Sequence, residues 1–156
     1  MRQLNGDLDY GFGTENQLLH WSKIGIITDL PDIKDCPKTP IWNQEESGSL
    51  EERARAYLDI NCAHCHNNKG PAMTSGLNLT AHETNQTAIG FNKSPVAAGR
   101  GSGGRLFDIV KGKPDKSILV YRMESTDPGV LMPEIGRKVV HNEGVELVRN
   151  WIKSLK

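Results

Sequence analysis

Two cysteines and a histidine stand close together before the middle of the chain. Cys62 and Cys65 are three positions apart, and His66 follows directly, in the segment Cys62-Ala63-His64-Cys65-His66. This spacing is the pattern through which c-type haem is attached to a polypeptide. Two such thiols can reach the two vinyl groups on one porphyrin edge, and the next residue then places an imidazole nitrogen beneath the iron. The pattern predicts one covalent haem c on Cys62 and Cys65, with His66 as the first axial ligand of its iron.

The two cysteines have other possible uses. A thioredoxin-like dithiol has the same Cys-x-x-Cys spacing, but there the motif opens a helix within a βαβ unit, and no strand pattern precedes it here. A zinc site would need further ligands at suitable spacing, whereas Cys36, His82 and His141 are scattered along the chain. Haem attachment is therefore the favoured interpretation. His64, between the two cysteines, is expected to be a solvent-side spacer.

An electron-transferring iron needs a sixth ligand, since two strong ligands in both oxidation states keep the change in geometry on reduction small. We favour Met132, because Leu131-Met132-Pro133 is an irregular, proline-stiffened segment that can present a thioether to the distal face of the haem. Met123 lies inside an expected helix, where methionine is more often core. His141 is the fallback ligand, and the competing interpretation places it exposed, just before a helix. The remaining candidates are Met73, His20 and His82.

Helices are expected to position these residues. Ser49-Leu50-Glu51-Glu52 is a capping box followed by apolar residues at helical spacing, which predicts a helix from about residue 50 into Cys62. Further helices are expected at residues 15–24, 115–123 and 142–155, with Thr14 as the cap of the first and Asn142 as the cap of the last.

Long loops connect these helices. Residues 67–104 are rich in Gly, Asn, Thr and Ser and poor in periodicity, and we find no convincing strand pairing. The formal Gly-x-Gly-x-x-Gly match at residues 99–104 follows no strand, so it predicts a flexible loop rather than a dinucleotide site. The expected fold class is all-α with long loops. Residues 1–48 form an N-terminal extension with a short helix and a proline-containing connector, and residues 49–156 form the haem domain.

Composition excludes several classes of protein. Nineteen basic and nineteen acidic residues give a net charge of zero, which does not favour binding to nucleic acid. No apolar run approaches the roughly 20 residues that span a bilayer, so no membrane span is expected. Three cysteines argue against a disulfide framework, and Cys36 is expected to be a free or dimer-forming thiol.

With these residues assembled, the C-terminal two-thirds of the chain resembles class I c-type cytochromes. The resemblance is carried by the helix before the haem motif, Gly70-Pro71 in the loop after it, the methionine loop at Met132, and a closing helix with Trp151. It implies a cytochrome c-like helical fold around one haem, and a carbonyl in the Pro71 loop that accepts a hydrogen bond from His66. It also implies that the first and last helices of the haem domain cross, with the contact made by Ala54, Tyr57, Val148 and Trp151.

Residues 112–119 and the pair Met132-Pro133 make the resemblance more specific. They are similar to the C-terminal haem domains of large exported bacterial proteins of poorly characterised function, in which another haem motif precedes this region. Only one such motif is present here, and the first residues hold no apolar segment that could act as a signal peptide. Because haem is normally attached outside the cytoplasm, we expect a mature form or a piece of a longer exported protein, located in the periplasm or elsewhere outside the cytoplasm.

The function expected from these features is electron transfer, with no substrate chemistry at this domain. Its partner would be a redox protein, or a fused dehydrogenase for which the haem is the electron outlet. The alternative is a haem enzyme or sensor whose distal position is open to peroxide or a small gas, with His82 or His141 as an acid-base residue. The sequence leaves the oligomeric state open.

Overall fold

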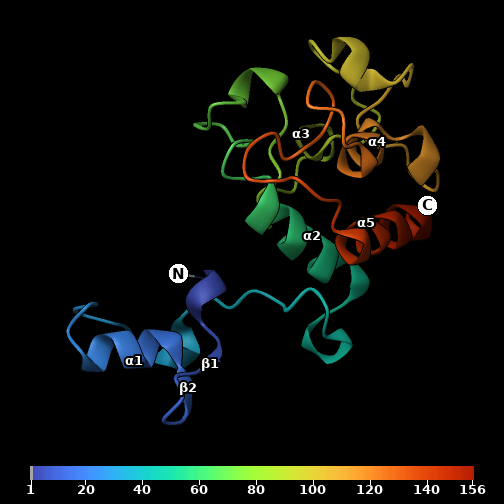
Figure 1. Ribbon diagram of the computed structural model, residues 1–156. Coiled ribbons are helices and arrows are strands. Elements are labelled where there is room, and N and C mark those ends of the chain that lie inside the picture. Colours follow the sequence, from blue (N-terminus) through green and yellow to red (C-terminus); the bar gives the residue numbers. More distant parts are fainter. Residues whose placement is uncertain (1) are drawn as a thin grey trace. The chain divides into compact units, whose positions relative to one another are not determined.

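The computed structural model describes residues 2–156. The chain divides into two compact units, one that ends at Pro40 and one that begins at Ile41 (Figure 1). Residues 41–48, which the sequence analysis assigned to the extension, group with the larger unit. The reason is Trp42, whose ring centroid lies 5.9 Å from that of Tyr57 and 4.8 Å from that of His141.

The smaller unit contains a two-stranded sheet and a short helix. Strand β1 (Asp7–Asp9) pairs antiparallel with β2 (Thr14–Asn16), which corrects the expectation of no strand pairing. Helix α1 (Gln17–Lys23) follows at once, and its cap is Asn16, whose side chain accepts from the backbone N–H groups of Leu18 and Leu19. The expected cap, Thr14, is wrong because that residue is engaged in the strand pair. Leu18 is fully buried, and short 3-10 helices lie at Arg2–Leu4 and Ile33–Asp35.

The larger unit is built from helices joined by long loops, so the prediction of a mostly helical chain is confirmed. Its α-helices are α2 (Leu50–Asn61), α3 (Gln86–Ile89), α4 (Ile118–Glu124) and α5 (Asn142–Ser154). Short 3-10 helices lie at Glu45–Ser47, Met73–Ser75, Gly99–Ser102 and Pro114–Lys116. None of the helices in residues 2–156 is both long and apolar enough to cross a bilayer.

The capping box of α2 is confirmed at both of its hydrogen bonds. The hydroxyl of Ser49 accepts from the backbone of Glu52 at 3.3 Å, and the Glu52 carboxylate accepts from the backbone of Ser49 at 2.9 Å. The two reciprocal bonds satisfy N–H groups that a helix start otherwise leaves unpaired, so α2 begins at a defined residue. The helix then runs up to Cys62, as predicted.

Two other helix boundaries differ from the expectation. The helix predicted at residues 115–123 is a 3-10 turn followed by α4, because Ser117 between them is extended and its hydroxyl bonds the backbone of Lys113 and Val110. Asn142 is not the cap of α5. It is the first helical residue, and the cap position is held by His141 without a side-chain hydrogen bond to the backbone.

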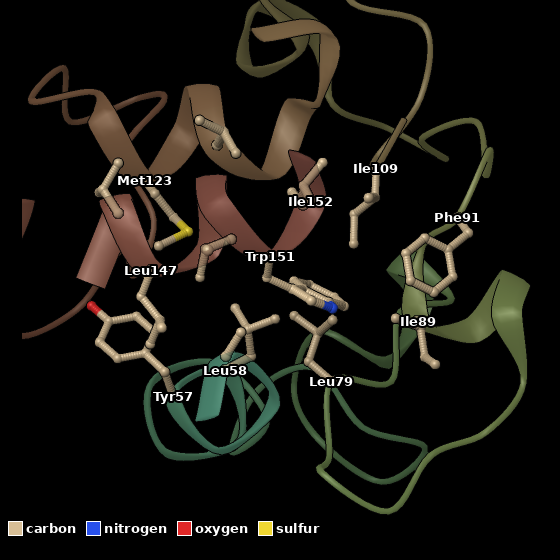
Figure 2. Close-up of a cluster of buried hydrophobic side chains, with 14 of the residues drawn as sticks. Tyr57, Leu58, Leu79, Ile89, Phe91, Ile109, Met123, Leu147, Trp151 and Ile152 are labelled. Atoms are coloured by element: carbon tan, nitrogen blue, oxygen red, sulfur yellow. The ribbon is translucent and has the colours of Figure 1, made fainter. Parts of the chain in front are cut away.

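The core of the larger unit lies between α2 and α5. Ala54, Tyr57, Val148 and Trp151, which the resemblance to cytochromes implied would meet, belong to one buried cluster. In Figure 2 the indole of Trp151 faces both Leu58 and Leu79, and Phe91 lies beyond it; the Phe91 and Trp151 ring centroids are 5.9 Å apart. Loop residues therefore complete the core that the two helices begin.

The two helices are tightly packed at Gly144, in the first turn of α5. A Cβ atom at this position would overlap the ring and hydroxyl group of Tyr57. Tyr57 is buried and cannot easily move away, since it also packs against Trp42 and hydrogen-bonds His141. A glycine is therefore required where α5 crosses α2.

Gly144→Ala tests whether the close contact with Tyr57 or the higher helix propensity of alanine has the larger effect on stability. Alanine favours a helix over glycine by about 1 kcal/mol, whereas overpacking costs about 1–3 kcal/mol. We expect a net loss of up to about 2 kcal/mol in the free energy of unfolding, measured by urea denaturation. Glu146→Ala, at an exposed position of the same helix, is the control and should stay within about 0.5 kcal/mol of the original chain. A stabilised Gly144→Ala chain would contradict the proposed packing.

Candidate functional site

The segment from Cys62 to His66 forms one tight turn at the end of α2. The N–H of Cys62 donates to the carbonyl of Leu58 at 2.8 Å, and the carbonyl of Cys62 in turn accepts from Cys65 at 3.1 Å and from His66 at 2.9 Å. Cys62 and Cys65 are both free thiols and half-buried, while His64 is exposed, as expected for a spacer. The turn therefore presents both thiols and the following imidazole from one rigid piece of backbone.

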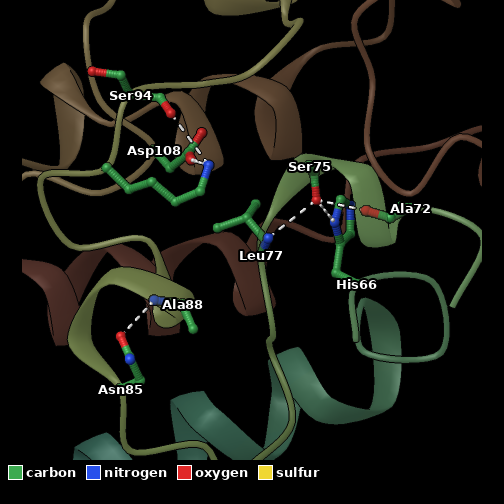
Figure 3. A network of polar contacts seen from close by, with 9 residues as sticks. His66, Ala72, Ser75, Leu77, Asn85, Ala88, Ser94 and Asp108 are labelled. Atoms are coloured by element: carbon green, nitrogen blue, oxygen red, sulfur yellow. Dashed lines mark hydrogen bonds and ion pairs between the residues drawn. The ribbon is translucent and has the colours of Figure 1, made fainter. Parts of the chain in front are cut away.

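Ser75 holds the ring of His66. Its hydroxyl oxygen lies 3.1 Å from Nδ1 of His66, donates to the carbonyl of Ala72 at 2.7 Å, and accepts from the N–H of Leu77 at 3.2 Å (Figure 3). A serine hydroxyl has a single hydrogen, and here it goes to Ala72. Ser75 therefore accepts from His66, which places the hydrogen on Nδ1 and leaves the lone pair of Nε2 available to a metal.

This arrangement corrects one expectation drawn from the resemblance to cytochromes. A carbonyl in the Pro71 loop was expected to accept directly from His66. The structure instead inserts the Ser75 hydroxyl between His66 and the carbonyl of Ala72. The physical reason is that a 3-10 turn at Met73–Ser75 brings the serine, rather than a carbonyl, against the imidazole.

The loop after the motif is held close to it by a glycine. The N–H of Ala72 donates to the carbonyl of Cys65 at 3.1 Å, and a Cβ atom at Gly70 would overlap that same carbonyl group. The carbonyl of His66 accepts from Leu79 at 2.9 Å, and Leu79 is part of the core. The imidazole is thus positioned by the loop on one side and tied to the core on the other.

The electrostatics of the motif favour uncharged side chains. Burial lowers the pKa of His66, and the nearby positive charge of Arg122 and the side chains of His64 and Lys93 lower it further. Burial raises the pKa of the Cys62 thiol to about 12, and Cys65 adds to the rise. A neutral imidazole is the form that binds metal. A thiol with so high a pKa is a poor nucleophile at neutral pH, which argues against a thioredoxin-like dithiol.

Met132 and Cys62 line the same cavity. The cavity has a volume of about 340 Å³, and its wall also includes Tyr57, Arg137 and His141. Met132 lies in an irregular segment, as predicted, and is half-buried, with its N–H bonded to the carbonyl of Arg122 at 3.0 Å. Cys65 and His66 lie outside the lining of this cavity. The lining of this cavity therefore includes Met132 and the first cysteine of the motif, together with His64 but not His66.

The other candidate ligands are exposed, are buried in the core, or belong to the smaller unit. His141 is largely exposed, and its Nδ1 lies 2.9 Å from the hydroxyl of Tyr57. Met123 is buried in the core with 4% of its surface exposed, as predicted. Met73 and His82 are exposed, and His20 belongs to the smaller unit, where it stacks on Tyr10. Cys36 is a free, buried thiol in that smaller unit.

Sequence reasoning missed three residues that the structure places around the motif and Met132: Ser75, Arg122 and Arg137. Each acts through a turn or a carbonyl group whose location depends on the folded loops. The sequence offered one hint: Arg122 is a charged residue among the apolar residues of the helix that precedes Leu131-Met132-Pro133.

The described residues fit a haem better than a zinc ion. Within residues 2–156, no group of three or more His, Cys, Asp or Glu side chains is placed to hold a metal ion, as a structural zinc site would require. A haem iron takes only two protein ligands, and the motif offers two free thiols and an imidazole with an available Nε2.

Comparison of the chain with protein-family models, curated proteins and solved structures found no match.

Ser75→Ala tests the orientation of His66. We expect loss of the hydrogen bond to Nδ1, so that the imidazole no longer keeps its hydrogen on that nitrogen alone. Nitrogen NMR of the His66 ring measures the hydrogen position directly. Ser75→Thr is the matched control, because threonine retains the hydroxyl and should retain the original ring spectrum. Identical ring spectra for the original chain and Ser75→Ala would refute the role of the serine.

Proposed function

We propose that this chain transfers electrons through one haem c that is attached to Cys62 and Cys65, with His66 and Met132 as axial ligands. The observation that carries the proposal is the turn after α2, which presents two free thiols and an imidazole whose Nδ1 is already hydrogen-bonded. The bound haem would supply an iron that alternates between the ferric and ferrous states.

The residues of the chain would divide the remaining work. Cys62 and Cys65 anchor the cofactor, which is necessary in a domain of this size because it cannot enclose a haem deeply. Ser75 keeps Nε2 of His66 directed toward the iron through the bond to Nδ1. Met132 would supply the second protein ligand and so leave no open position for small molecules. Together these residues would hold the group in one arrangement when an electron arrives or leaves.

A cytochrome c-like fold belongs to the same proposal. Its support is the contact between α2, which leads into the attachment motif, and α5, which closes the chain. The proposed partner is a redox protein or a fused dehydrogenase, and this domain itself has no catalytic role. Since haem is normally attached outside the cytoplasm, we propose a periplasmic or other extracytoplasmic location.

A second candidate is a haem enzyme or sensor with an open distal position. The observation that favours it is that His141 and Arg137 line the same cavity as Met132. Without a methionine ligand, those two side chains would face a peroxide or small gas on the iron. The two candidates differ in one property, namely whether the thioether of Met132 is bonded to iron.

Met132→Ala separates the candidates. For an electron carrier, the oxidised chain shows the charge-transfer absorption of a thioether bonded to iron, and Met132→Ala abolishes that absorption while the haem remains attached. Met73→Ala is the matched control, because Met73 is exposed and 56% of its surface is accessible. An oxidised spectrum that is the same with and without Met132, together with rapid binding of carbon monoxide to the reduced chain, would favour the open distal site.

A further inference from the structure

The segment that carries Met132 has little hydrophobic packing of its own. Residues 132–141 contain no helix or strand, and Ile135 and Val139 expose 86% and 77% of their surface. Leu131, just before Met132, is the buried anchor at one end of the segment, and the bond between His141 and Tyr57 holds the other. Burial alone therefore gives weak control over the position of the thioether between them.

Arg122, on α4, holds the start of this segment from two sides. Its backbone carbonyl accepts from the N–H of Met132 at 3.0 Å, and its side-chain Nε donates to the carbonyl of Val130 at 2.9 Å. The two bonds enclose Leu131, so this short stretch cannot slide along α4 without breaking both. One residue thus fixes the backbone on either side of Leu131 and up to Met132 itself.

Arg137 returns the contact from the loop to the helix. Its two terminal nitrogens donate to the carbonyl groups of Met123 and Ser125. These carbonyls stand at the C-terminal end of α4, where a helix leaves its last acceptors unpaired and where a positive charge is favourable. A guanidinium group suits this position, because it can donate to two acceptors at once from a rigid plane.

From these contacts we infer that Arg122 and Arg137 form a reciprocal clasp that positions Met132 for ligation. One arginine reaches from the helix to the loop, the other reaches from the loop to the helix, and Met132 lies between them in the chain. The inference rests on the proposed function, because it gives the clasp the task of keeping the thioether on the iron. Both arginines are positioning residues, because the hydrogen bonds of their side chains go to backbone carbonyl groups of the loop and of α4.

The clasp explains how an exposed loop could hold a weak ligand. A thioether dissociates readily unless its backbone is kept close to the metal. Arg122→Gln removes the bond to Val130 and keeps the backbone bond to Met132, whereas Arg137→Gln removes both bonds from the loop to the end of α4. Each loss should therefore weaken ligation without removing the haem, the attachment motif or the packing between α2 and α5.

Imidazole binding to the oxidised haem protein measures the strength of the clasp, since imidazole must displace Met132 to reach the iron. We expect Arg122→Gln and Arg137→Gln each to bind imidazole about tenfold more tightly than the original chain, because the first loses one hydrogen bond from a charged group and the second loses two. Arg137→Lys keeps the charge but not the paired donors, so its affinity should fall between those of the original chain and Arg137→Gln. Arg149→Gln is the control for charge, because Arg149 forms its ion pairs with Asp115 and Glu124, which lie outside the loop.

The outcomes separate the clasp from the proposed function. If the arginine variants bind imidazole as the original chain does while Met132→Ala binds it more tightly, the ligand is correct and the clasp is refuted. If Met132→Ala also binds imidazole unchanged, Met132 is not a ligand, and the proposed ligation fails together with the clasp. Should a glutamine variant not fold, Arg122→Lys and Arg137→Lys decide, and an imidazole affinity equal to that of the original chain in both would overturn the clasp.

Discussion

The close packing of Tyr57 against Gly144 is the contact on which the rest of the larger unit depends. It sets how near α5 can approach α2, and α2 ends at Cys62. The hydroxyl of Tyr57 also bonds His141, the residue that ends the methionine loop and precedes α5. One side chain therefore connects the helix that ends at Cys62, the helix that completes the core, and the loop that carries Met132.

The surroundings of the motif favour uncharged side chains. Burial raises the pKa of the Cys62 thiol to about 12 and lowers the pKa of His66, and the Ser75 hydroxyl fixes which imidazole nitrogen is free. A reactive dithiol would need the opposite environment, with positive charge and exposure that stabilise a thiolate. The same environment suits side chains that are to be bonded to a cofactor and then remain unchanged while an electron moves.

Sequence patterns predicted the parts of the site that depend on local spacing. The turn at Cys62, the capped start of α2 and the irregular segment at Met132 each depend on neighbouring residues, so they could be expected before the structure. The hydrogen bond from His66 to Ser75 and the two arginine contacts depend on how distant loops close, which no short pattern records. The predicted caps of α1 and α5 were wrong for a related reason. Strand β2 runs from Thr14 to Asn16, so α1 begins after Asn16, and the cap position of α5 is held by His141.

The central claim is that Cys62 and Cys65 carry one covalent haem, and mass spectrometry of the chain after export in a bacterium that attaches c-type haem tests it most directly. The account predicts that the denatured chain keeps the mass of one haem and that fragmentation places it on the peptide containing Cys62 and Cys65. A colourless chain in which both cysteines carry free thiols, or a haem that separates on denaturation, would contradict it.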